Sequence, residues 1–249
     1  MYCALNACPN AVQGPEFLPK QLLILKALSG LSKMVFYKSG EMRTLRTIAD
    51  LLFADGQLDA AEKAAEKVIN LGDREPSVSD CHILLGRIHC ERGNTESAIT
   101  HFEIVLRIAS PFNRHGQLFS GHYNLAKLFA EQGRFNDAHT HIGHAKPYAH
   151  ATNNNLRIGR AMYLQAWIWY REGKFVEAKA EALHTVTVFE ELGAMEWLKG
   201  ARKLLQAIEE EIDKWFTEGL DFSSGEPPET VLLPTITDVS FSGGSFTSH

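Results

Sequence analysis

The sequence predicts an all-α protein, a solenoid of antiparallel helix pairs, and three observations lead to this prediction. Glycines that would close a helix recur at Gly56, Gly93, Gly133 and Gly173, at intervals of 37, 40 and 40 residues. An alanine stands five residues after each of these glycines, and a small residue stands seven residues before each. Helix–turn–helix units that repeat with a period near 40 residues are typical of helical solenoids.

The recurring small residues have a packing role. Two antiparallel helices approach closely only where the side chains at their crossing are small. Larger residues then fill the remaining space, and four residues before each glycine stand Leu52, His89, Phe129 and Trp169. A glycine can also adopt the positive φ that ends the first helix of each pair.

Composition limits the classes of function. Of the 249 residues, 45% are apolar and 22% are charged, as in soluble globular proteins, and the net charge is −5. A chain without a bulk positive charge is not expected to bind nucleic acid or an anionic membrane. The longest apolar cluster, Leu22–Leu25, is too short to cross a bilayer. Four cysteines without a CxxC spacing predict reduced thiols, and we expect a cytoplasmic protein.

The chain begins and ends outside the predicted array. Residues 1–16 predict an irregular lead-in, because proline and glycine interrupt any period. Residues 17–38 predict an N-terminal helical cap or a partial repeat, with apolar residues at spacings of three and four. Residues 195–216 predict a C-terminal capping helix. Residues 217–249 are rich in Ser, Gly, Thr and Pro and predict a disordered tail, with a docked strand as the alternative.

Between these ends we predict four repeats, at 41–71, 77–109, 117–149 and 156–192. Pro76 and Pro111 fall between repeats, as helix-breaking residues should. Pro147 lies late in a predicted helix, so we expect that helix to end or kink there. The predicted helices are Glu41–Ala54, Leu58–Leu71, Ser77–Arg92, Thr95–Ala109, Gln117–Gln132, Phe135–Ala149, Leu156–Glu172 and Phe175–Leu192.

Three segments carry a family resemblance. HYNLAKLFAEQGRFNDA (122–138) resembles the first helix and turn of the tetratricopeptide repeat (TPR), and REGKFVEAKAEA and ERGNTESAITHF resemble its turn and second helix. The resemblance implies a right-handed α-solenoid whose first helices line a concave surface that binds a partner. The period of 40 departs from the family's usual ~34 residues. The additional residues fall in the loops around 110–117 and 151–155.

The resemblance implies a site in this concave groove. Positive charge and aromatic rings dominate the positions that it places there, and such a groove suits an acidic protein or peptide segment with an apolar anchor. The predicted partner-binding residues are Arg43, Arg46, Arg87, Tyr123, Asn124, Lys127, Arg160, Tyr163, Trp167, Tyr170 and Arg171. The alternative is that these charged residues have no binding role and only form a solvated inner wall.

Some TPR proteins bind a C-terminal carboxylate with a clamp of polar residues. Arg87, Asn124 and Arg160 stand at positions that resemble three members of that clamp. Ile83 and Leu164 stand where two further polar members are expected, so the resemblance does not imply a complete clamp.

We expect no catalysis, no cofactor and no metal. The sequence lacks the glycine-rich phosphate loops and the hydrolase motifs that would suggest an enzyme. Among the eleven histidines, we expect His139, His141, His144 and His150 to form a solvated face and His82, His89 and His122 to be core or semi-buried. The predicted function is therefore a protein-interaction module. The alternative is a sensor or oligomerisation fragment that resembles the arrays of STAND-type signalling proteins and self-associates through its end helices into homo-oligomers.

Overall fold

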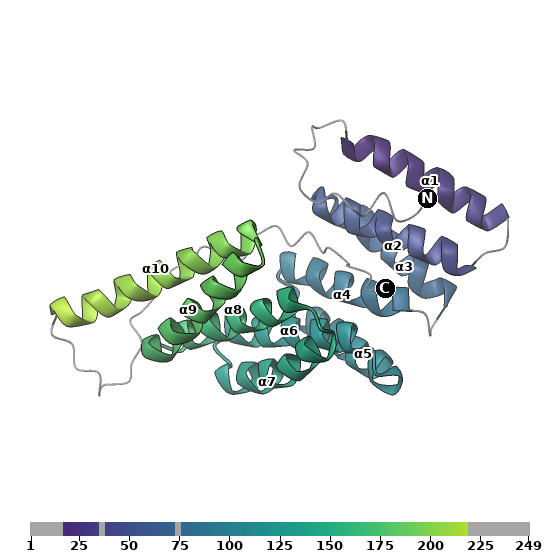
Figure 1. Ribbon diagram of the computed structural model, residues 1–249. Helices are drawn as coiled ribbons and strands as arrows, with labels where there is room; N and C mark the ends of the chain where they lie inside the picture. The colour runs from purple at the N-terminus through teal and green to yellow at the C-terminus, as the bar shows by residue number, and fades with distance from the viewer. Residues whose placement is uncertain (1–16, 35–37, 73–75, 219–249) are drawn as a thin grey trace. The chain divides into compact units, whose positions relative to one another are not determined.

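A computed structural model describes residues 17–34, 38–72 and 76–218 of the chain (Figure 1). Within these residues the secondary structure is helical, and they contain no strand. The described residues divide into a first compact unit that ends at His101 and a second that begins at Phe102. The predicted lead-in at 1–16 and most of the predicted tail, from residue 219, lie outside the described residues.

The first unit contains successive helices that pack on their neighbours. α1 packs on α2, α2 on α3 and α3 on α4, and α2 also contacts α4. Met42, Ala65 and Ile88 are fully buried between them. The helices are α1 (Phe17–Met34), α2 (Lys38–Ala54), α3 (Leu58–Leu71), α4 (Pro76–Glu91) and α5 (Thr95–Ala109), of which α5 continues into the second unit.

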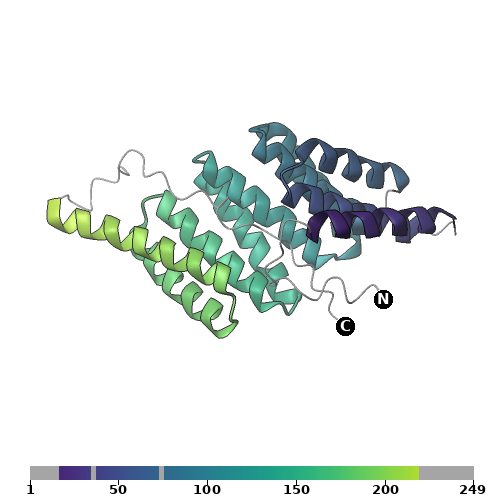
Figure 2. The ribbon, with the colours of Figure 1, turned by 90° about the horizontal axis from the view of Figure 1, so that it is seen from above.

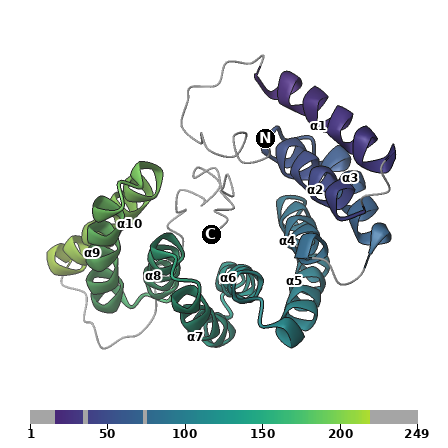
Figure 3. The same ribbon diagram turned by 45° about the vertical axis from the view of Figure 1, so that its right-hand side comes forward.

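The second unit repeats the pattern of packed pairs. Each helix contacts the next, α6 also contacts α8, and α8 also contacts α10 (Figure 3). α10, yellow-green in Figure 2, lies along α9. After a short 3-10 helix (Ser110–Phe112) come α6 (His115–Glu131), α7 (Phe135–Ala151), α8 (Asn155–Arg171), α9 (Phe175–Glu191) and α10 (Met195–Glu218).

The four periodic glycines end the first helices as the sequence predicts. Their φ angles are all positive, from +72° to +82°. At Gly133 the amide donates to Ala130 O at 3.1 Å, and the Arg134 amide donates to Phe129 O at 2.8 Å. These two bonds form a Schellman motif, which satisfies carbonyls that the end of α6 would leave without partners.

The small residues lie at the helix crossings. Ala61, Ala98, Ala138 and Ala178, the alanines that follow the glycines, are all fully buried. The fit is tightest at Gly159 on α8, where an added Cβ would lie 2.6 Å from Cε1 of Phe189 on α9. The prediction of an all-α array of packed helix pairs is therefore confirmed.

The helix that contains Pro147 was expected to end or kink at the proline, and it does not end there. α7 does not end at Pro147 but continues to Ala151 with the proline inside it. Pro147 and Gly143, the residue whose carbonyl loses its helical partner, are both exposed. Water can hydrate that carbonyl, so the missing hydrogen bond costs less than it would in a core.

None of the described helices is both long enough and apolar enough to cross a membrane.

Candidate interaction surface

Arg160 on α8 is the centre of the predicted surface in the second unit. Its guanidinium carbon lies 4.9 Å from the centroid of the Tyr123 ring, 5.8 Å from that of Phe119 and 5.1 Å from that of Trp197. Three rings from α6 and α10 therefore surround one cation. Such cation–π contacts fix the plane of the guanidinium and restrict its rotamers.

Asn124 and Lys127 on α6 are both half-buried and are positioned by their own helix. The Asn124 amide nitrogen donates to Ser120 O at 2.7 Å. Lys127 Nζ lies 3.5 Å from Glu131 Oε1 one turn further along. Partners three or four residues away on the same helix can hold side chains in this way.

Four predicted groove residues lie inside the protein rather than on its surface. The exposed fractions are 1% for Tyr123, 7% for Tyr163, 4% for Trp167 and 5% for Tyr170. At Tyr163 the burial comes in part from α10, because Trp197 on that helix packs edge-on against the Tyr163 ring. These rings leave little surface for a partner to touch, so they support the surface from below.

Each of the four buried rings carries a hydroxyl or an indole N–H at its tip. Trp167 Nε1 and Tyr170 Oη have no hydrogen-bond partner among the described residues. Burial, together with the nearby carboxylates of Glu211 and Glu210, raises the pKa of Tyr170 to about 12, so its hydroxyl keeps its proton at neutral pH. Arg171 lies beside them, with its guanidinium carbon 5.5 Å from the Trp167 centroid.

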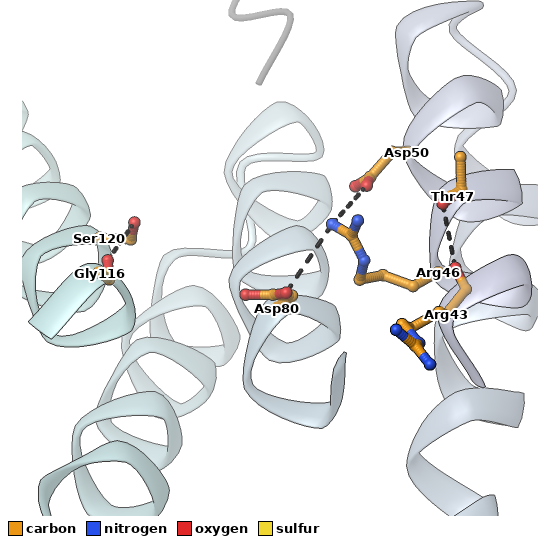
Figure 4. Close-up of polar contacts among 7 residues, drawn as sticks. All are labelled: Arg43, Arg46, Thr47, Asp50, Asp80, Gly116 and Ser120. Atoms are coloured by element: carbon orange, nitrogen blue, oxygen red, sulfur yellow. Dashed lines mark hydrogen bonds and ion pairs between the residues drawn. The ribbon is translucent and has the colours of Figure 1, made fainter. Parts of the chain in front are cut away.

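Arg46 of the first unit belongs to an internal charge network (Figure 4). Its Nη1 lies 3.0 Å from Asp50 Oδ2 on the same helix and 3.8 Å from Asp80 Oδ2 on α4. Burial raises the pKa of Asp50, with Asp80 adding to the rise and with Arg46 and Arg87 opposing it. Arg46 therefore ties α2 to α4.

The other two predicted residues of the first unit differ in exposure. Arg43 is exposed, and its Nε donates a long hydrogen bond of 3.4 Å to Ser39 O. Arg87 is half-buried, and its guanidinium carbon lies 4.5 Å from the centroid of the Phe53 ring. Of the three clamp-like residues, Arg87 belongs to the first unit and Asn124 and Arg160 to the second.

Sequence reasoning missed a polar contact that recurs between successive helix pairs. It joins the residue six after one periodic glycine to the residue just before the next glycine. At the first junction Glu62 Oε2 lies 2.8 Å from Arg92 Nη1, and at another His139 Nε2 lies 2.7 Å from Glu172 Oε2. Lys179, six after Gly173, lies 3.0 Å from Glu209 on α10. Comparing these two register positions along the sequence would have found the first two pairs, but not the pair of Lys179 and Glu209, which lies outside the register.

The histidines gather in groups but form no metal centre within the described residues. A search there finds no set of three or more His, Cys, Asp or Glu side chains arranged to hold an ion. His139 is engaged by Glu172, and His141 by His122, with 3.0 Å between their Nδ1 atoms. His144 is exposed beside them.

Comparisons with known proteins agree with this architecture. Residues 46–113 match the tetratricopeptide repeat family model. No curated protein matches the chain. The crystal structure of BtubC (BKLC) from P. vanneervenii aligns with a TM-score of 0.60 and 14% identity, over 87% of this chain and 97% of that one.

Two structures of nearly identical TPR-like repeats from Podosopora anserina also align. Both are 15% identical to this chain, with TM-scores of 0.56 and 0.53. They cover 73% and 72% of this chain, and 91% and 90% of their own. TPR repeats are generally protein–protein interaction modules, and proteins built from them are typically non-catalytic scaffolds. The chain is therefore similar to tetratricopeptide repeats over residues 46–113, and its described residues have the fold of a TPR-like α-solenoid.

Proposed function

We propose that this chain is a non-catalytic interaction module that binds an acidic segment of a partner protein. In the second unit the proposed contact is the α6–α8 surface, which we define as Asn124, Lys127, Arg160 and Arg171. Three of these four side chains are cationic, and the other is an amide that can both donate and accept. The partner segment is then one that presents carboxylates.

The observation that carries the proposal is that the Arg160 guanidinium packs against three aromatic rings. A guanidinium held in one plane loses less entropy when it binds a carboxylate through two parallel hydrogen bonds. It has five N–H donors, so it can keep contacts within the protein and bind a ligand at the same time.

Charge reversal tests the proposal. The probes are fluorescent peptides of equal length, one acidic, one neutral and one basic, and binding is measured by polarisation. We expect only the acidic peptide to bind, and Arg160→Glu to weaken it at least tenfold, about 1.4 kcal/mol. Arg107→Glu, an exposed arginine on α5, is the control and should change little. Equal weakening by both variants, or equal binding of all three peptides, would contradict the proposal.

Self-association is a second candidate, favoured by the exposed face of α1. Leu23 and Ile24 on this helix expose 70% and 47% of their surface. Apolar residues exposed next to each other on a terminal helix of a repeat array can pack against another copy. A mass from light scattering that rises with concentration, and that Leu23→Lys abolishes, would support this candidate. A constant monomer mass would exclude it.

A further inference from the structure

Two pairs of histidines meet in the same way at equivalent places in the repeats. Nδ1 of His82 on α4 lies 3.0 Å from Nδ1 of His101 on α5, and Nδ1 of His122 on α6 lies 3.0 Å from Nδ1 of His141 on α7. The members of each pair are 19 residues apart, and the second pair follows the first by 40 residues, the repeat period. The chain therefore builds the same contact twice.

A third imidazole joins each pair. The His89 ring stacks on His101, with centroids 5.2 Å apart and planes inclined by 11°. The His144 ring lies 5.1 Å from His122. We call His82, His89 and His101 the first triad, and His122, His141 and His144 the second triad.

The short distance between the Nδ1 atoms fixes how each pair is protonated. A hydrogen bond between two ring nitrogens needs one N–H and one lone pair, so a neutral pair contains one Nδ1–H ring and one Nε2–H ring. The first added proton leaves this bond intact, because an imidazolium still donates to a neutral ring. The second leaves two N–H groups facing each other, so the bond is lost and the two charges repel.

The surroundings of the second triad oppose charge. Burial lowers the pKa of His122 to about 4, with His141 and His144 adding to the effect, and no carboxylate opposes it there. Burial also lowers the pKa of His141, with His144 and Arg134 acting in the same direction and with Asp137 and Glu103 opposing it. The Tyr148 ring stacks on His122, with the two ring centroids 5.9 Å apart.

The first triad has a similar environment. Burial lowers the pKa of His101, and His89 adds to this, while Glu62 on α3 opposes it. Glu62 also forms an ion pair with Arg92, at 2.8 Å. The positive charge of Arg92 offsets part of the effect of Glu62 on the His101 ring.

We propose that the two histidine triads are proton-binding elements that hold their helix pairs closed near neutral pH and loosen them as the solution becomes acidic. In the unfolded chain a histidine takes up its proton near pH 6.5. In the folded chain the pKa values of His101, His122 and His141 are lowered, that of His122 to about 4, so between about pH 6.5 and pH 4 the open state binds more protons than the closed one. Stability then rises with pH in this window and is lost as the pH falls through it. This inference does not depend on which partner the chain binds.

Hydrogen exchange of the full chain, read by mass spectrometry, tests the proposal. After correction for the intrinsic pH dependence of exchange, peptides of α6 and α7 should open at least tenfold more at pH 5.0 than at pH 7.5, the effect of one unit of pKa. In His122→Gln with His141→Gln the two amides can still bond each other but do not titrate, so the change should fall below about twofold. His184→Gln, at an exposed histidine of α9, is the matched control and should behave as the unsubstituted chain does.

A second measurement needs no variant and so does not depend on the double substitution folding. Nitrogen NMR of the unsubstituted protein at pH 7.5 should show one Nδ1–H and one Nε2–H ring in the pair of His122 and His141. Both rings should titrate below the ordinary value of about 6.5. Titration of both at that ordinary value, or an acid-induced rise in exchange that is as large in α9 and α10 as in α6 and α7, would overturn the proposal.

Discussion

His139 on α7 donates from Nε2 to Glu172 Oε2 at the end of α8, over 2.7 Å. Its other ring nitrogen lies 3.2 Å from the amide nitrogen of Gln165, which can only donate. This arrangement suits the tautomer in which Nε2 carries the proton and Nδ1 accepts. Glu172 also binds Lys174 Nζ at 2.8 Å. One carboxylate thus joins the second helix of one pair to the first helix of the next.

Glu172→Gln should lower the free energy of unfolding by about 1 kcal/mol at pH 7, since the contact is only partly buried. Burial raises the pKa of Glu172, but the hydrogen bonds from Lys174 and His139 outweigh it, so the net pKa lies below the ordinary value. A carboxyl with a lowered pKa stabilises the fold above its unfolded value of about 4.3 and loses this contribution as the pH falls below it.

The difference between Glu172→Gln and the unsubstituted chain should therefore shrink below about pH 4.3. Urea unfolding at several pH values measures it. Glu177→Gln, an exposed carboxyl in the first turn of α9, is the control and should stay within about 0.5 kcal/mol. A difference that grows in acid would contradict the assignment.

Ala138→Leu should destabilise the protein by about 1–3 kcal/mol, because Ala138 is fully buried where two helices cross and has no room for a larger side chain. Thermal unfolding followed by circular dichroism measures the change. Thr140→Leu introduces the same side chain at an exposed position of the same helix and should have little effect. If both variants unfold at the same temperature, the crossing is not as tight as described.

Two glycines of the α6–α7 pair should respond to alanine in opposite directions. Gly133 has a φ of +75°, which alanine adopts only with strain, so Gly133→Ala should destabilise the protein by about 1 kcal/mol. Gly143 lies inside α7 with no atom within 4 Å of an added Cβ, so Gly143→Ala should stabilise it by about 0.5–1 kcal/mol. Chemical denaturation measures both, and a shared sign would show that one of the two backbone conformations is assigned wrongly.

Gly159→Ala should be the most damaging of the small substitutions. The added Cβ would lie 2.6 Å from Cε1 of the buried Phe189. The expected loss is about 2–3 kcal/mol, as for other overpacked cores. Phe189→Leu removes the clashing ring, so the two changes together should cost less than the sum of each alone. A strictly additive pair, measured by urea unfolding, would place the ring away from the glycine.

The fold was predictable because its determinants are local and repeated. Gly133 and Ala138 stand at fixed positions of every unit, and the turn and the crossing that they form need no knowledge of distant residues. Pro147 shows the limit of this reasoning. Its effect depends on whether the carbonyl of Gly143 meets water, and that is decided by how α7 is exposed.

The candidate surface was less predictable, because it depends on which helices cover it. Tyr163 and Trp167 have the spacing of residues that face a groove, but α10 covers this side of α8 and Trp197 packs on Tyr163. The contact between α10 and α8 joins residues far apart in sequence, and the repeat pattern does not extend to α10. The charges of Lys127, Arg160 and Arg171 could be read from the sequence. The packing of the Tyr123 and Trp197 rings around Arg160 could not.

The recurring junction between helix pairs also fixes their order. At the first junction the second helix supplies the acid, Glu62, and the following helix the base, Arg92. At the junction of α9 with α10 the polarity is reversed, with Lys179 facing Glu209. A shuffled protein that placed α3 before α8 would set Glu62 against Glu172, two like charges at one seam. An exchange of repeats that brings these two carboxylates together is therefore expected to lower stability.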